Sequence, residues 1–354
     1  GCPALGRHQN PVAKKAYAEA VARDMSWPEK AAHIRATGMA TATECLDVPD
    51  DAYVDGAVAN ACIELLGQLA ASNRPFFLAA GFGKPHLPFA VPAAYWERYD
   101  PVQFHPHPFQ ERAEGAPAYA YSFMDELHAY SDVPAEGEAL SAELQRRLIH
   151  GYHASVSYVD AQIGKLLDRL KELELEQNTI VVLWGDHGWH LGDHGLWCKH
   201  TNYEQATRAP LIIAAPGYEG GRTTASLVEF VDIFPTLCEL SGLPVPERLD
   251  GVSLVPLLRD PDITIKGGAL SQYPAHRVEG ITGYALRTPR YRLVLWMKSP
   301  FDSTRPFEDK LVDAVELYDY RQDPLETMNL ADHPGHRRIL EELKEGFIGF
   351  FGSR

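Results

Sequence analysis

Residues 185–200, with the sequence GDHGWHLGDHGLWCKH, concentrate four histidines, two aspartates and one lysine in a short loop. Asp186 and His187 offer a carboxylate oxygen and an imidazole nitrogen from adjacent positions, and divalent cations accept both kinds of donor. The alternative is a structural turn capped by Asp186, with the flanking glycines supplying unusual backbone angles. Because a hard cation such as calcium takes about six to eight donors, further carboxylates must come from elsewhere in the fold. The pair therefore predicts part of a metal site.

Cationic residues at the end of this loop and near residue 85 predict a binding site for an anion. Lys199 follows a glycine-rich loop that can fold it back over a metal at Asp186, although most lysines are solvated surface residues. Lys84 and His86 repeat the combination of an ammonium and an imidazole after the apolar run Phe76–Ala80, which we expect to be a buried strand. Together these groups favour a pocket for a multiply charged oxyanion with a proton donor close by.

The remaining side chains of the loop have alternative interpretations. Trp189 and Trp197 either stack on a sugar ring or pack the loop. Three polar residues are expected to orient the metal ligands and the loop through hydrogen bonds: His190, Asp193 and His194. The sequence contains no Gly-x-Ser-x-Gly, Walker-type or dinucleotide-binding motif, which leaves this loop as the main chemical signal.

The composition excludes some partners for the chain as a whole. The 354 residues include 33 Lys and Arg against 48 Asp and Glu, a net charge of −15. A nucleic-acid backbone and an anionic membrane surface are therefore not expected as partners. The five cysteines are scattered and form neither a zinc motif nor a disulfide framework. No run approaches the roughly 18 apolar residues of a membrane span. These features leave the oligomeric state open.

Alternating helical and apolar segments predict the elements that position these residues. The pattern indicates helices near 11–23, 54–69, 141–173, 230–240 and 336–347. The β-branched apolar runs Thr179–Trp184 and Pro210–Pro216 indicate strands. We therefore expect an α/β fold with a mixed, mostly parallel sheet flanked by helices. Because ligands bind beyond the carboxyl ends of such strands, Asp186 and His187 stand where chemistry is expected.

The sequence pattern changes after residue 258. Short strands are predicted at Tyr284–Leu286, Tyr291–Trp296 and Glu316–Tyr318, followed by the terminal helix. This pattern is typical of a small antiparallel α+β subdomain. The predicted organisation is a larger α/β domain, residues 1–262, and a C-terminal subdomain, residues 263–354.

Six segments together resemble type I sulfatases, most closely the iduronate-2-sulfatase branch. They are GKPHLPF at 83–89, YHASVSYVD at 152–160, the loop 185–199, VDIFPTL at 231–237, SQYP at 271–274 and ELYDYRQDP at 316–324. The resemblance runs in family order from about Cys45 to the C-terminus. It implies the alkaline-phosphatase-like α/β sandwich with a small C-terminal antiparallel subdomain, which agrees with the class predicted from the pattern.

The resemblance implies a reaction and two cofactors. The expected reaction is the removal of sulfate from a sulfated uronate or related sugar of a glycosaminoglycan-like polysaccharide. Asp186 and His187 match part of the family's Ca²⁺ site, and two further aspartate ligands are expected before Gly1. The nucleophile of the family is a formylglycine made from the Cys or Ser of a Cys/Ser-x-Pro-x-Arg motif. A periplasmic, secreted or lysosomal location is expected by the same resemblance.

The resemblance also implies roles for residues at the substrate. His86 is expected to contact the sulfate and to protonate the leaving oxygen, and Lys199 is expected to neutralise sulfate oxygens. Lys84 and Trp189 are the expected substrate-binding neighbours.

The sequence departs from the family in features that the family places before the matched region. It contains no Cys/Ser-x-Pro-x-Arg, no Asp-Asp first strand and no Gly-Lys-x-x-His segment, and Cys2-Pro-Ala-Leu-Gly-Arg7 has the wrong spacing. The expectation is that the larger domain is incomplete, so that the chain is truncated and inactive alone. The alternatives are a phosphodiester or phosphonate ester hydrolase of the same superfamily, or a non-catalytic sugar-binding relative.

Overall fold

The computed structural model describes residues 8–72, 74–121, 125–300 and 308–352. The chain forms two compact units. The first contains residues 1–108 and 124–178, and the second contains residues 109–123 and 179–354. The predicted division at residues 262 and 263 stays a prediction. In the described part of the chain, no helix is both long enough and apolar enough to cross a membrane.

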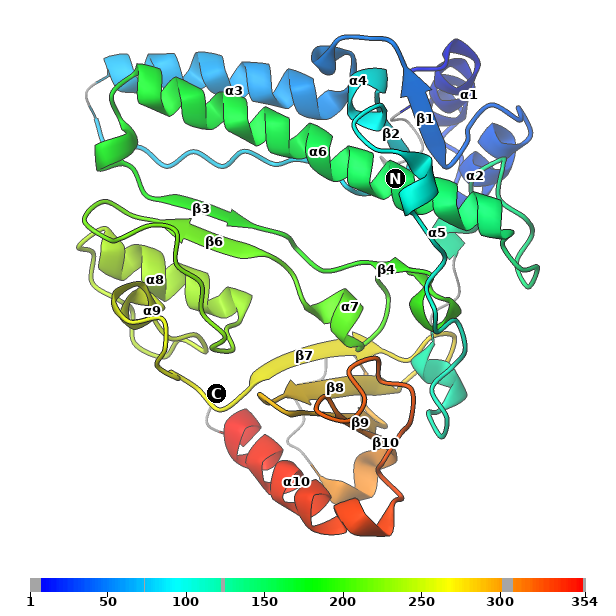
Figure 1. Cartoon of the computed structure of the whole chain (residues 1–354), viewed down its shortest axis with the longest axis vertical. Helices are drawn as coiled ribbons and strands as arrows, with labels where there is room; N and C mark the ends of the chain where they lie inside the picture. The colour runs from blue at the N-terminus through cyan, green and yellow to red at the C-terminus, as the bar shows by residue number, and fades with distance from the viewer. Residues whose placement is uncertain (1–7, 73, 122–124, 301–307, 353–354) are drawn as a thin grey trace. The chain divides into compact units, whose positions relative to one another are not determined.

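Helices dominate the first unit, and the predicted helices are confirmed. The predictions near 11–23, 54–69 and 141–173 correspond to α1 (Pro11–Ala22), α3 (Val54–Ala71) and α6 (Ala142–Glu172). The helices α2 (Trp27–Arg35), α4 (Ala93–Trp96) and α5 (Asp125–His128) were not predicted. The Ser141 side chain caps α6 by accepting from the Leu144 amide at 3.1 Å. Figure 1 shows α3 and α6 lying side by side. Two short strands, β1 (Thr43–Leu46) and β2 (Phe89–Pro92), pair in parallel beside α6.

Tyr158 and Gly151 of α6 explain how this helix packs. The Tyr158 hydroxyl accepts from the Gly56 amide at 2.7 Å and donates to the Asp50 carbonyl at 2.9 Å, which joins α6 to the start of α3. A Cβ atom at Gly151 would lie 2.8 Å from the Cβ of Phe89. Glycine at this position therefore lets α6 approach β2 closely.

The expected strand Phe76–Ala80 is wrong. Among the described residues no segment pairs with it, and exposed and half-buried side chains alternate along it, with Phe77 82% exposed. A strand needs a neighbour for its backbone N–H and C=O groups, and an apolar sequence alone does not supply one. Lys84 and His86 therefore follow an extended segment and lie in a turn before β2.

The second unit begins with a two-stranded sheet and a small hairpin. β3 (Val181–Trp184) pairs antiparallel with β6 (Leu211–Ala214), and β4 (His190–Leu191) pairs antiparallel with β5 (Trp197–Cys198). The helices α7 (Glu204–Thr207), α8 (Ile233–Leu240) and α9 (Val255–Arg259) follow. Both predicted strands and the predicted helix at 230–240 are confirmed. The sequence predicts mostly parallel strand pairs. Among the described strands, however, β1 and β2 alone pair in parallel, and the other pairs are antiparallel.

A four-stranded antiparallel sheet with a terminal helix completes the second unit (Figure 1). Its strands are β7 (Ala269–Pro274), β8 (Thr282–Arg287), β9 (Tyr291–Met297) and β10 (Val312–Asp319), in the order β10-β9-β8-β7. The helix α10 (Arg337–Gly352) places Leu343 and Phe347 against the buried Leu293 and Leu317. The predicted short strands and terminal helix are confirmed.

Candidate functional site

The turn after β3 is fixed by hydrogen bonds to the segment 206–210. The Gly185 amide donates to the Pro210 carbonyl at 3.1 Å, and the Gly188 amide donates to the Ala206 carbonyl at 2.8 Å. A Cβ atom at Gly188 would lie 1.9 Å from the carbonyl oxygen of Gln205. Only glycine fits this close approach. The two glycines thus hold the intervening Asp186 and His187 at the end of the strand.

Asp186 and His187 present two ligand atoms close together. Nδ1–H of His187 donates to the Gly188 carbonyl at 2.7 Å, which leaves Nε2 of the neutral ring with its lone pair. This Nε2 lies 3.5 Å from Oδ2 of Asp186, whose side chain is 87% exposed. Two donors at this separation can both reach one cation at about 2.0–2.6 Å. The pair therefore fits a shared divalent cation, as the sequence predicts.

The second unit does not complete a metal site around this pair. Among the described residues, no group of three or more His, Cys, Asp or Glu side chains is arranged to hold a metal ion. A calcium ion needs more oxygen donors than this pair offers. Calcium binding therefore stays a prediction, and it requires donors beyond Asp186 and His187.

Trp189 and Lys199 extend the row that begins at the Asp–His pair. The rings of His187 and Trp189 stack at 6.0 Å with an interplanar angle of 28°. Nζ of Lys199 lies 5.1 Å from the centre of the Trp189 ring, on its face. The hairpin of β4 and β5 produces this contact because it returns the chain to the start of the loop. The structure thus brings together four predicted residues.

Trp197 serves a different purpose from Trp189. Its side chain is only 4% exposed. Of the two alternatives for the tryptophans, packing of the loop therefore applies to Trp197.

Asp193 organises the inside of the loop. Nδ1–H of His190 donates to Oδ2 of Asp193 at 2.5 Å, and Nε2 of His190 pairs with the Thr201 hydroxyl at 2.7 Å. His194 lies on the other side, with Nδ1 3.4 Å from the same carboxylate oxygen. These contacts join the first and last parts of the loop that carries Lys199. They support the expected orienting role of the three residues for the loop.

The charge of Asp193 makes the stability of the loop dependent on pH. Burial alone would raise the pKa of Asp193, but hydrogen bonds from His190 and His194 outweigh burial and hold the pKa well below its usual value. A carboxyl group whose folded pKa is lowered stabilises the fold above its unfolded pKa of about 3.9 and loses this contribution as the pH falls further.

We expect Asp193→Asn to lower the free energy of unfolding by about 1.5–3 kcal/mol at pH 7, because it removes a charged partner from two buried histidines. The difference from the wild type should shrink as the pH falls below about 4. Urea unfolding at a series of pH values measures both effects. A difference that stays constant between pH 7 and pH 3 would contradict the charge argument.

Lys84 is buried in the turn before β2. Asp55, near the start of α3, accepts from the Gly83 amide at 2.9 Å and from the Lys84 amide at 2.7 Å. Lys84 as a whole residue is 8% exposed, and its ammonium group donates to the Pro88 carbonyl. These contacts fix the turn, and a role for Lys84 at the substrate stays a prediction.

His86 contacts a carboxylate that the sequence did not indicate. Its Nδ1–H donates to the Leu87 carbonyl at 2.8 Å, and its Nε2 lies 3.3 Å from Oε2 of Glu126. Glu126 belongs to α5, which comes after a proline-rich segment far along the chain. Local patterns do not reveal such a long-range pair. His86 and Lys84 belong to the first unit, whereas Asp186, His187 and Lys199 belong to the second.

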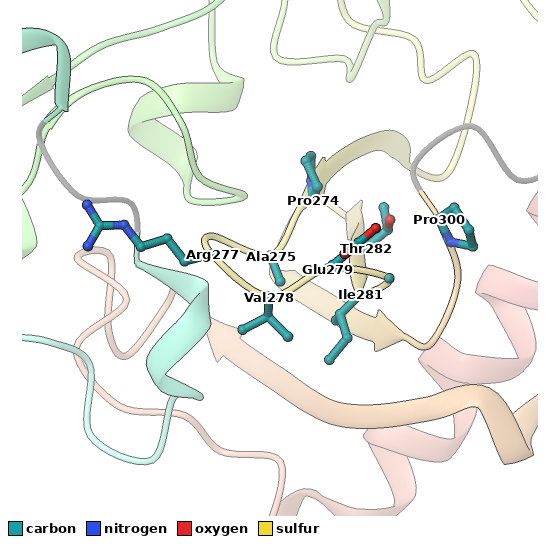
Figure 2. Close-up of a pocket in the computed structure, with 9 residues that line it drawn as sticks. Pro274, Ala275, Arg277, Val278, Glu279, Ile281, Thr282 and Pro300 are labelled. Atoms are coloured by element: carbon teal, nitrogen blue, oxygen red, sulfur yellow. The ribbon is translucent and has the colours of Figure 1, made fainter. Parts of the chain in front are cut away.

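A hollow of about 460 Å³ lies at the turn between β7 and β8. Figure 2 shows the side chains of this turn, with Pro300 facing them and Arg277 extending away from the others. The end of β7 lies beside the Lys199 segment, because the ring of Tyr273 is 5.7 Å from that of His200 and its carbonyl accepts from Asn202 at 3.3 Å. The strand that leads into the hollow therefore contacts the residues that follow Lys199.

Comparisons with known proteins indicate the family of the chain. The sulfatase family model matches residues 12–243, and the model of the N-sulphoglucosamine sulphohydrolase C-terminal region matches residues 192–349. Human iduronate 2-sulfatase is 32% identical in an alignment of 351 positions that covers 81% of this chain and 64% of that protein. A sulfatase of Formosa agariphila is 33% identical over 273 residues, which is 77% of this chain and 49% of that protein. The chain thus spans roughly half to two thirds of these relatives.

Solved structures show the same fold at lower identity. A protein in complex with its substrate D-glucosamine-2-N,6-O-disulfate has a TM-score of 0.68 at 23% identity, over 85% of this chain and 70% of that one. The phosphonate monoester hydrolase of Agrobacterium radiobacter has a TM-score of 0.71 at 23% identity, over 86% of this chain and 62% of that one. The expected alkaline-phosphatase-like α/β fold is confirmed. With the family model matching most of the chain, this protein belongs to the sulfatase family.

Proposed function

We propose that the protein containing this chain hydrolyses a sulfate ester of a sulfated uronate or related sugar in a glycosaminoglycan-like polysaccharide. The observation that carries the proposal is the row formed by Asp186, His187, Trp189 and Lys199. It contains a carboxylate–imidazole pair, an aromatic face and an ammonium group side by side in one loop. The similarity to iduronate 2-sulfatases supports the choice of sulfate and of a uronate sugar.

The residues have complementary roles in this reaction. Lys199 neutralises negative charge on the sulfate oxygens, and His86 donates a proton to the leaving alcohol oxygen as the S–O bond breaks. A Ca²⁺ ion held by Asp186, His187 and further oxygen donors would supply positive charge at the sulfate. The sequence contains no Cys/Ser-x-Pro-x-Arg motif, so the expected formylglycine nucleophile is not assigned to a residue of this chain.

The hollow between β7 and β8 is the proposed position of the sugar. Its lining is mainly apolar with charged residues at the turn, and Tyr273, in the strand that leads into it, contacts His200, the residue after Lys199. The apolar faces of a pyranose ring suit such a lining, whereas its hydroxyl groups can face solvent. Lys84 and Trp189 are further proposed substrate neighbours.

The test compares an aryl sulfate with an aryl phosphodiester, using the protein as its gene encodes it. We expect the sulfate ester to be the preferred substrate and calcium removal by a chelator to lower the activity. Asp186→Ala should weaken calcium binding, measured by titration calorimetry, about 10-fold or more, while the exposed control Asp262→Ala leaves it unchanged. Calorimetry gives a readout that does not depend on turnover.

Either of two outcomes would contradict the proposal and favour another function. A large preference for the phosphodiester would favour the phosphonate or phosphodiester hydrolases of the superfamily. Binding of a sulfated sugar without turnover of either ester would favour a non-catalytic sugar-binding protein.

A further inference from the structure

His86 and Glu126 form a histidine–carboxylate pair in the first unit. Nε2 of His86 lies 3.3 Å from Oε2 of Glu126, and each side chain is 24% exposed. The pair is thus accessible enough to meet a ligand and shielded enough to hold its geometry. The proposed function uses His86 alone and gives Glu126 no role.

The other contacts of His86 determine which ring nitrogen faces Glu126. The Leu87 carbonyl can only accept a hydrogen bond, so Nδ1 of His86 carries a hydrogen. The nitrogen beside Glu126 is therefore Nε2, which carries a hydrogen only in the imidazolium form. In that form the Glu126 carboxylate accepts from the Nε2–H group and so orients the ring. The ring is consequently fixed with Nε2 as the only nitrogen that can exchange a proton with a ligand.

Both partners are anchored by buried contacts within the same unit. On one side, the buried Asp55 holds the amides of Gly83 and Lys84, and the His86 amide donates to the Gly83 carbonyl at 3.0 Å. This arrangement fixes the turn that presents the imidazole ring.

On the other side, Arg35 of α2 holds the chain that follows Glu126. Its guanidinium donates to the carbonyls of Tyr130 and Val133, each at 2.7 Å. Leu127, next to Glu126, is completely buried. The carboxylate therefore extends from a segment that is held in place, which is what a positioning role requires.

We infer that Glu126 is a positioning residue for proton transfer from His86 to the leaving alcohol oxygen, an inference that rests on the proposed function. The Nε2–Oε2 distance of 3.3 Å is long for an N–H···O hydrogen bond, so the same N–H can also face a substrate oxygen. As an incoming oxygen nucleophile bonds to sulfur and the S–O bond to the alcohol breaks, the Nε2–H bond breaks and its proton forms an O–H bond with the leaving oxygen. His86 becomes neutral, and Glu126 remains a carboxylate throughout.

The inference predicts a dependence on the leaving group. An alkyl or sugar alkoxide is a poor leaving group and needs a proton in the transition state, whereas 4-nitrophenolate leaves without one. Glu126→Gln should therefore lower kcat about 10- to 100-fold for a sugar sulfate and less than about 3-fold for 4-nitrophenyl sulfate. The conservative variant Glu126→Asp should recover part of the loss.

A matched control is available in the same unit. Oε2 of Glu19 lies 3.4 Å from Nε2 of His33 in a comparable pair. Glu19→Gln should leave kcat unchanged for both the sugar sulfate and 4-nitrophenyl sulfate. Equal losses of Glu126→Gln on both sulfates, or no loss on the sugar sulfate, would overturn the inference while leaving the sulfatase activity established. A wild type that hydrolyses neither sulfate would instead refute the proposed function and, with it, the role of Glu126.

Discussion

Replacing Lys199 by methionine is expected to lower kcat/KM for the sulfate ester by about 100- to 1,000-fold. Negative charge accumulates on the sulfate oxygens and the leaving oxygen in the transition state, and an ammonium fixed nearby stabilises that charge without having to reorganise. Methionine keeps most of the length of the side chain, so contact with Trp189 is preserved while the charge is lost. The measurement is steady-state kinetics of the protein as its gene encodes it, with thermal unfolding recorded in parallel.

The outcome separates a role at the substrate from a role in folding. Lys199→Arg retains the charge and should keep a part of the activity, although the planar guanidinium does not reproduce the position of an ammonium. The control is Lys310→Met, because Lys310 is 76% exposed and forms a surface ion pair with Glu308. A Lys199→Met variant with kcat/KM within a few-fold of the wild type would show that the anion is bound elsewhere.

The sequence was sufficient where local patterns determine the structure. The helix at 141–173 is confirmed as α6, because its apolar positions recur with helical spacing and Ser141 caps its start. The chemistry of the loop after β3 was predictable for a similar reason. Glycines at 185 and 188 define a tight turn, so Asp186 and His187 have little freedom at the end of the strand.

The sequence was insufficient where the structure depends on distant partners. The apolar run Phe76–Ala80 has the composition of a buried strand, but composition does not specify a strand to pair with. Glu126 reaches His86 only through the fold, and no spacing in the sequence connects them. Lys84 was expected near the substrate, which stays a prediction, but the sequence did not indicate its contacts with Asp55 and Pro88. Pairings between distant segments therefore limited the prediction.

Arg292 is a further residue that the sequence did not indicate, since arginine is rarely fully buried. It lies in β9 and is 1% exposed. Its guanidinium donates to the Asn202 carbonyl at 2.8 Å and to the Thr207 hydroxyl at 3.0 Å, and it pairs with Glu204. These three partners directly follow the segment that carries Lys199. Arg292 thus ties the loop of the candidate site to the C-terminal sheet.

The remaining contacts of Arg292 complete a buried charge network. Nε lies 2.8 Å from Oε1 of Glu326, which is completely buried, and donates to the Tyr320 hydroxyl at 2.7 Å. Burial alone would lower the pKa of Arg292, but its acidic neighbours outweigh burial and hold the pKa above its usual value. The guanidinium is therefore charged at every pH at which the protein folds.

We expect Arg292→Met to lower the free energy of unfolding by about 3–5 kcal/mol. Most of this loss comes from Glu326, which would be left as a buried carboxylate without its cation, whereas Glu204 is 21% exposed and keeps Arg287 at 3.0 Å. Chemical denaturation at pH 7 measures the change, and Arg338→Met is the control because Arg338 is 91% exposed and should cost about 0.5 kcal/mol or less. A second substitution, Glu326→Gln, should lower the free energy of unfolding less in the Arg292→Met background than in the wild type. The reason is that it removes a buried carboxylate that has already lost its cation. A loss below about 1 kcal/mol for Arg292→Met, or additive effects in this cycle, would show that the network does not hold the Lys199 loop in place.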